Sequence, residues 1–227
     1  MRVDLNFGKN GCPVEFSDDW DVTIIRKPTM PIESHGKSAL QRALNNPVGS
    51  PTVRHLAQGK KNVCILICDI TRPVPNGTIL PVLIKELIDA GVESRHITVL
   101  VATGLHRPNE GQELEELVGD SWVLKTVKVV NHFANRDSDH VEVGVTNYGT
   151  KVRLDHRFVN ADLKIVTGLV EPHLFAGYSG GRKVITPGIA HAETISTLHN
   201  AHFIEHPSSP KDKRSKIKRC GSIRDAT

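Results

Sequence analysis

The stretch that decides the fold is VCILICDITRPVPNGTILPVLIKELIDAG, residues 63–91. It begins with a continuous apolar run over residues 63–67, which is typical of a strand buried on both faces of a sheet. A turn-rich loop over residues 69–75 follows. Residues 79–90 then have helical spacing, and Gly91 provides a C-cap. Strand, loop and helix in this order predict one unit of a parallel α/β sheet.

The same order continues toward the C-terminus. Residues 97–102 predict a second buried strand, residues 110–118 a helix, and residues 124–131 a third strand. Such a βαβαβ order implies a parallel sheet with right-handed crossovers. We therefore predict an α/β fold, Rossmann-like, with a mostly parallel sheet and flanking helices.

The remaining segments are assigned by the same rules of apolar spacing and turn residues. They are a β-rich start over residues 1–30, including Val22, Ile24 and Ile25, a helix over 33–44, a β-hairpin over 141–154, a buried strand over 163–168, a Gly-rich loop over 170–187, and a helix over 189–204. Together they place one α/β domain over residues 1–206.

The segment 207–227 differs in composition from the rest. Residues 208–227 carry seven Lys/Arg and two Asp, a net charge of +5, whereas the whole chain carries +4. We predict a basic disordered tail, and two origins stay open: a native charged tail or a frame-shifted end. The rest of the chain is close to neutral, so we expect no nucleic-acid partner.

Composition also limits where the protein works. The sequence has no apolar run of about 18 residues and no apolar leader, so we expect neither a membrane partner nor secretion. The four cysteines form no disulfide framework, which favours a reducing, cytoplasmic location. Cys64 and Cys68 lie on and after a buried strand, where cysteine behaves as a small apolar residue rather than as a metal ligand.

Chemistry-bearing residues follow the predicted strands, where ligands bind in doubly wound sheets. Asp69, Thr71 and Arg72 leave the first strand together, and a guanidinium beside a helix N-terminus favours an anion. The alternative is an Asp69–Arg72 pair that only braces the loop. His106 follows the second strand, where it is either an acid–base group or a solvated surface residue.

The third loop contains EPHLFAGYSGGRKVITPG, residues 171–188. Its glycines, among them Gly180 and Gly181, allow close backbone approach to a ligand, and Lys183 is a possible phosphate contact or nucleophile. The spacing is not that of a P-loop. Downstream, His199, His202 and His206 share one helical face and would suit a zinc site, although Pro207 disfavours helix at His206.

Taken together, four motifs resemble the lactate racemase family over residues 10–206. They are DITRPVP from Asp69, ATGLHR ending the second strand, PHLFAGYSGGRK around His173 and Lys183, and the later His199. The family fold is two α/β domains with the active site between them. The resemblance thus assigns this chain to the N-terminal domain.

The resemblance implies a cofactor and a set of roles. The cofactor is a nickel pincer, a pyridinium mononucleotide with two sulfur-bearing groups. It would be attached covalently to Lys183 and would lie near Asp69, Thr71, Arg72, Gly180 and Gly181. His199 would bind the nickel, and His106 and His173 would be the paired acid–base residues. The implied reaction is racemisation or epimerisation of a small 2-hydroxyacid by reversible hydride transfer to the cofactor.

Two alternatives remain beside this isomerase. The second domain of the family is absent from this sequence, so the chain is interpreted as a truncated member. That observation favours a non-catalytic domain that binds the cofactor or a phosphate. A zinc hydrolase using the three downstream histidines is the other alternative. The identity of the 2-hydroxyacid and the oligomeric state are not predicted.

Overall fold

The structure of the chain is a computed structural model that describes residues 1–8, 10–26, 28–173 and 176–200. The chain divides into two compact units, residues 1–34 and residues 35 onward. In the first unit, β1 (Arg2–Leu5) pairs with β2 (Cys12–Glu15) as an antiparallel ribbon. The predicted β-rich start is confirmed for these strands, but Val22, Ile24 and Ile25 lie outside any strand.

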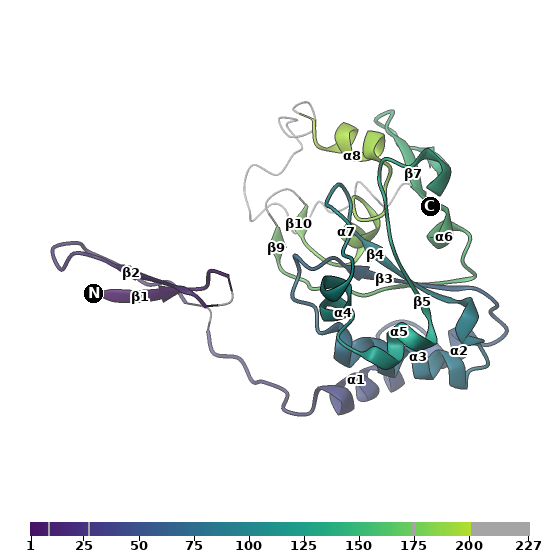
Figure 1. Ribbon diagram of the computed structural model, residues 1–227, viewed down its shortest axis with the longest axis horizontal. Coiled ribbons are helices and arrows are strands. Elements are labelled where there is room, and N and C mark those ends of the chain that lie inside the picture. Colours follow the sequence, from purple (N-terminus) through teal and green to yellow (C-terminus); the bar gives the residue numbers. More distant parts are fainter. Residues whose placement is uncertain (9, 27, 174–175, 201–227) are drawn as a thin grey trace. The chain divides into compact units, whose positions relative to one another are not determined.

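The second unit is built on a parallel sheet of four strands in the order β5-β4-β3-β8 (Figure 1). The strands are β3 (Val63–Cys68), β4 (Ile97–Ala102), β5 (Lys128–Asn131) and β8 (Leu163–Val166). The chain moves outward from β3 through β4 to β5, and then returns to the other side of β3. This reversal is a topological switch point, where α/β sheets bind ligands. The predicted fold class is confirmed.

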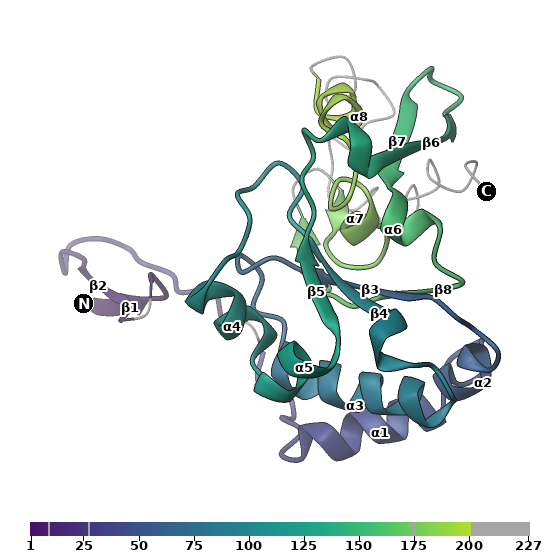
Figure 2. The same ribbon diagram turned by 45° about the vertical axis from the view of Figure 1, so that its right-hand side comes forward.

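Alternate residues of β3 serve two separate cores, which explains its continuous apolar run. Val63, Ile65 and Ile67 pack on the face covered by α3 (Asn76–Asp89), whereas Cys64 and Leu66 pack toward Phe158 and Val184. The helices of the first face are α1 (Gly36–Asn45), α2 (Val53–Ala57), α3, α4 (Gln112–Val118) and α5 (Ser121–Thr126). On the other face lie α6 (His156–Val159) and α7 (Arg182–Ile185) (Figure 2).

The predicted hairpin is also present. β6 (His140–Val145) pairs antiparallel with β7 (Lys151–Asp155). Leu154 forms a bridge to Ala190, just before α8 (Ala192–Leu198), so the hairpin fixes the start of that helix. The remaining elements are the short strands β9 (Pro172–His173) and β10 (Gly177–Tyr178) and two 3₁₀ turns, η1 (Ser94–His96) and η2 (Asp137–Asp139).

Several predicted boundaries are wrong for local reasons. Residues 124–126 belong to α5 rather than to a strand, because the Asp120 carboxylate accepts the N–H groups of Trp122 and Val123 and starts a helix there. The predicted helix over 189–204 begins only at Ala192, after the side chain of His191 caps it by accepting the Glu193 N–H.

Other differences concern three short helices and the start of α3. The short helices α2, α6 and α7 were not predicted, and each has only four or five residues. α3 begins three residues earlier than predicted, at Asn76. Residues 201–206 of the domain and the predicted disordered tail, 207–227, lie outside the described residues. No helix in the described part of the chain is long and apolar enough to cross a membrane.

Candidate functional site

A cleft of about 850 Å³ opens at the carboxyl ends of β3, β4 and β8. The three chemistry-bearing loops meet here because parallel strands all end at the same edge. The cleft is lined by eight of the nine residues predicted for the site, namely Asp69, Thr71, Arg72, His106, His173, Gly180, Lys183 and His199. The ninth, Gly181, lies outside the lining and is the N-cap residue of α7.

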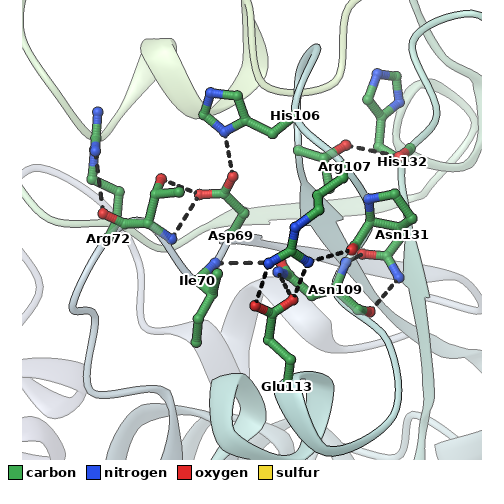
Figure 3. A network of polar contacts seen from close by, with 12 residues as sticks. Asp69, Ile70, Arg72, His106, Arg107, Asn109, Glu113, Asn131 and His132 are labelled. Atoms are coloured by element: carbon green, nitrogen blue, oxygen red, sulfur yellow. Dashed lines mark hydrogen bonds and ion pairs between the residues drawn. The ribbon is translucent and has the colours of Figure 1, made fainter. Parts of the chain in front are cut away.

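Asp69 and His106 form a close pair across two loops (Figure 3). The His106 Nδ1 atom lies 2.5 Å from Asp69 Oδ2. The Asp69 carboxylate is buried and also accepts the Thr71 hydroxyl at 2.6 Å and the Thr71 N–H at 3.2 Å, both through Oδ1. Because a carboxylate only accepts, His106 donates from Nδ1, and in the neutral ring the lone pair is on Nε2.

Arg72 pairs with the third loop rather than with Asp69. Its Nε atom lies 3.7 Å from Glu171 Oε1, and Nη1 donates to the Thr71 carbonyl. The alternative in which Asp69 and Arg72 only brace one loop is therefore not what the described residues show. Arg72 is 32% exposed, so its guanidinium remains accessible to a carboxylate or a phosphate.

Lys183 lies in α7 and is half-buried at the floor of the cleft. Burial lowers the pKa of its amine, and the nearby charge of Arg72 lowers it further, while Cys68 and Asp69 act in the opposite direction. A lowered pKa increases the fraction of neutral amine at neutral pH, and the neutral amine is the nucleophilic form of lysine.

His173 lies on β9, on the third side of the cleft. Its Nδ1 atom accepts the Ala176 N–H at 3.2 Å, so the neutral ring carries its proton on Nε2. For the neutral rings, these contacts assign opposite tautomers to His106 and His173. One ring presents a lone pair at Nε2 and the other presents an N–H at the same atom.

The glycine loop is held by Ser179, a residue that the sequence reasoning missed. Its buried hydroxyl donates to the Leu169 carbonyl at 2.5 Å and accepts the Glu171 N–H at 3.0 Å. A serine between Tyr178 and Gly180 is a weak pattern by itself, because serine is common in turns. Its role becomes visible only when the two sides of the loop are seen to meet.

Gly180 and Gly181 both have positive φ, +70° and +51°. A Cβ on Gly180 would lie 3.0 Å from the Leu169 carbonyl oxygen, whereas a Cβ on Gly181 would meet no atom within 4 Å. Gly180 is therefore required by close approach to its own chain. At Gly181 the backbone conformation alone favours glycine.

His199 is the C-cap residue of α8, and its Nδ1 atom donates to the Ile195 carbonyl at 2.9 Å. In the neutral ring this contact assigns the lone pair to Nε2, and a lone pair of this kind is what a metal binds. His202 and His206 lie outside the described residues, so the zinc triad is not tested. Within the described ranges, no three His, Cys, Asp or Glu side chains form a metal site.

The cysteines behave as the apolar interpretation predicts. Burial raises the pKa of the Cys64 thiol to about 12, and burial also raises the pKa of Cys68. Both side chains are therefore neutral thiols near pH 7, and a neutral thiol is a poor metal ligand. Cys68 lines the cleft beside Lys183 and contributes an apolar wall.

Comparison with known proteins adds an independent finding. Residues 7–212 match the family model described as the lactate racemase N-terminal domain. The chain is 38% identical over 211 residues to the lactate racemase of Lactiplantibacillus plantarum, covering 92% of this chain and 49% of that protein. It is 35% identical over 209 residues to the lactate racemase of Thermoanaerobacterium thermosaccharolyticum, covering 91% and 48%.

Comparison with solved structures agrees with the sequence comparison. The lactate racemase apoprotein from Thermoanaerobacterium thermosaccharolyticum is similar with a TM-score of 0.81 and 31% identity, covering 100% of this chain and 54% of that one. A crystal structure of a Thermotoga maritima protein, at 22% identity and a TM-score of 0.59, has the same fold. The chain spans about half the length of the curated relatives that it matches.

Proposed function

We propose a function for this chain from the premise that it belongs to the lactate racemase family. It is a racemase or epimerase domain for a small 2-hydroxyacid, and it holds a nickel-pincer cofactor on Lys183. One observation carries the proposal. A single cleft brings together a carboxylate–imidazole pair, a second histidine whose Nδ1 accepts a backbone N–H, a lysine with a lowered pKa, and a third histidine whose Nδ1 contacts a backbone carbonyl.

The donor set fits the cofactor. Among the described residues we assign His199 as the ligand to nickel, and the cofactor can bring further donors of its own. The two sulfur-bearing groups of the pincer are such donors, and nickel suits sulfur and imidazole ligands. Lys183 would hold the cofactor covalently through its amine, the more easily because its pKa is lowered.

The proposed acid–base chemistry uses the Nε2 atoms of His106 and His173. When bound, the cofactor supplies a reversible acceptor for the hydride of the substrate Cα, which leaves a planar 2-oxoacid. His106 would take the proton of the substrate hydroxyl on Nε2 as the alcohol is oxidised to the ketone, and Asp69 would stabilise the resulting imidazolium. His173 would return a proton from Nε2 when the hydride comes back to the opposite face, having entered the step as an imidazolium whose Nδ1 proton replaces the contact with the Ala176 N–H, so that a neutral ring is left. In the reverse direction the two histidines exchange roles.

Substrate orientation requires a cation near this pair. Arg72 lies on the same loop as Asp69 and can hold a carboxylate through two donors. Its ion pair with Glu171 at 3.7 Å is long and half-exposed, so a substrate carboxylate can compete with it. We assign Arg72 to the 2-hydroxyacid carboxylate or to an anionic group of the cofactor.

A second candidate is a domain that binds the cofactor, or a phosphate, without turnover. The observation in its favour is the exposure of His106, whose side chain is 60% accessible to solvent. Hydride chemistry of this kind usually requires a site from which water is excluded. In this alternative, the same residues bind but the reaction does not proceed.

The experiment that tests the proposal starts with the intact mass of the chain purified from a host that makes the pincer cofactor. We expect a covalent adduct that is absent from Lys183→Ala, and an unmodified chain from that host would contradict the proposal. Racemisation of a 2-hydroxyacid by the same sample, lost in both His106→Ala and His173→Ala, would separate the enzyme from the binding domain. An adduct without turnover would support the binding domain instead.

A further inference from the structure

Asn109 is a buried polar residue in the loop that carries His106. It is 2% exposed, although loop residues are usually on the surface. The backbone and side-chain polar groups of Asn109 make four hydrogen bonds. They connect it to Ile70, Asn131 and Glu113 (Figure 3). Each polar atom of Asn109 thus has a partner, which indicates a fixed geometry rather than an incidental contact.

These bonds join the ends of three strands. Asn109 Oδ1 accepts the Ile70 N–H at 3.3 Å, in the loop after β3 and directly next to Asp69. The Asn109 N–H donates to Asn131 Oδ1 at 3.0 Å, and Asn131 Nδ2 donates back to the Asn109 carbonyl at 2.8 Å. Asn131 is the last residue of β5. The His106 loop is thereby tied to its neighbours on both sides.

A fourth bond fixes the orientation of the Asn109 side chain. Its Nδ2 donates to Glu113 Oε2 at 2.8 Å, which requires the oxygen to face Ile70. Glu113 is itself held by Arg107 through two short contacts, at 2.6 and 2.7 Å. The hydrogen bond from Arg107 and then that from Asn109 lower the pKa of Glu113 to about 2, so the acceptor stays ionised near neutral pH.

We infer that Asn109 is a positioning residue that sets the distance between Asp69 and His106. The two partners come from different loops, so their 2.5 Å contact depends on how the loops are aligned. Asn109 is the side chain that joins the backbone next to Asp69 to the loop of His106. Its effect on catalysis rests on the proposed function, but its effect on the His106 tautomer does not.

The test uses the unloaded chain with ¹⁵N-labelled histidine, whose NMR correlations report which ring nitrogen carries the proton. The His106 resonances are assigned by their loss in His106→Gln. We expect the Nδ1–H form of His106 in the unmodified chain and loss of that form as the major tautomer in Asn109→Ala. A folded Asn109→Ala protein in which His106 keeps Nδ1–H would overturn the inference.

The matched control is Asp162→Ala. Asp162 also ties two distant segments, because it accepts the N–H groups of Lys61 at 2.9 Å and Asn62 at 3.0 Å, but it does so at the amino end of β3 and β8. It should destabilise the domain without changing the His106 tautomer. The same tautomer change in both variants would mean general loosening and would overturn the inference.

A measurement on the unmodified chain covers the case in which Asn109→Ala does not fold. The Ile70 amide should exchange with solvent at least about tenfold more slowly than an unprotected amide, because it donates to Asn109. Unprotected exchange would overturn the inference. In an active, cofactor-loaded chain we further expect Asn109→Ala to lower kcat while KM changes little. Absence of racemisation in the unmodified chain would count against the proposed function and leave the tautomer result intact.

Discussion

Replacing Asp69 by Asn is the sharpest perturbation of the cleft, because it changes charge without changing shape. In the structure, Asp69 Oδ1 accepts two donors from Thr71 and Oδ2 accepts the His106 Nδ1–H. An asparagine has only one oxygen. Because Thr71 supplies two donors, that oxygen should stay with Thr71, and the amide NH₂ should face His106.

The consequence for His106 is a change of tautomer. Facing a donor, Nδ1 must accept, and the ring proton moves to Nε2, where the base would act. Loss of a positioned general base costs about 10²–10⁴ in rate, which corresponds to roughly 3–5 kcal/mol in the barrier. The unfolding free energy should change by less than about 3 kcal/mol, since a charge-assisted hydrogen bond is lost but a buried charge is also removed.

The assay has two parts. Racemisation by the cofactor-loaded chain should fall by that factor in kcat, with little change in KM. Histidine ¹⁵N NMR of the unloaded chain should show the His106 proton on Nε2. Thr71→Val is the control, because it removes one donor to Asp69 but leaves the carboxylate for His106. For Thr71→Val we expect the racemisation rate to fall by about tenfold or less.

The reasoning is refuted by a variant that keeps its activity. If Asp69→Asn racemises within about threefold of the unmodified chain, which is less than the loss of a single hydrogen bond, His106 does not act as the base of this pair. An unchanged Nδ1–H tautomer in the same variant would show that the amide oxygen faces His106 instead. The first result would remove the Asp69–His106 pair from the proposed acid–base chemistry, and the second would refute the predicted change of tautomer.

Three further predictions follow from named contacts. Arg72→Met should raise the pKa of Lys183, because the Arg72 charge helps lower it. The pH dependence of Lys183 labelling by an amine-directed reagent, measured by peptide mass, should therefore shift to higher pH. In the control Arg182→Met, this pH dependence should stay unchanged. Asp155→Ala should destabilise the domain by about 3–5 kcal/mol in urea unfolding, because Arg157 and the fully buried His132 lose their carboxylate. Burial opposes ionisation of Asp155, but its hydrogen bonds from Arg157 and His132 lower its pKa. The unmodified chain should therefore keep this stability at pH values above 3.8, the ordinary pKa of the group, and lose it as the pH falls below that value. Gly180→Ala should destabilise the domain more than Gly181→Ala in thermal unfolding. Both positions have a positive φ, which costs about 1–2 kcal/mol for alanine, but only a Cβ at position 180 meets the Leu169 carbonyl. Equal losses of stability in the two variants would show that this close approach is relieved at no cost.

The sheet was predictable from local patterns. The apolar runs that became β3 and β4 are long enough to be buried on both faces, and the intervening helix has a clear period and a glycine cap. The short elements were not predictable in this way. Residues 124–126 have strand-like composition but follow Asp120, whose capping bonds outweigh that preference. In short segments the free energy of one cap is comparable to the summed propensity of the residues.

The sequence by itself predicted most of the side chains that line the cleft. Asp69, Arg72, His106 and Lys183 follow strands of one parallel sheet, so their convergence at one edge is a consequence of topology. Strand order was not contained in the local pattern, because the return of the chain to pair β8 beside β3 depends on contacts about 100 residues apart. That pairing creates the switch point at which the cleft opens.

Only the tertiary structure decided how the site residues are paired. The sequence presented Asp69 and Arg72 as neighbours, whereas the fold joins Asp69 to His106 and Arg72 to Glu171. It also brought the Nδ1 atoms of His106, His173 and His199 to a carboxylate, a backbone N–H and a backbone carbonyl, and we assign the tautomers of the neutral rings from these partners. Residue type fixes which nitrogen atoms are available, but the proton on an imidazole is placed by the partner that the folded chain brings within hydrogen-bond distance.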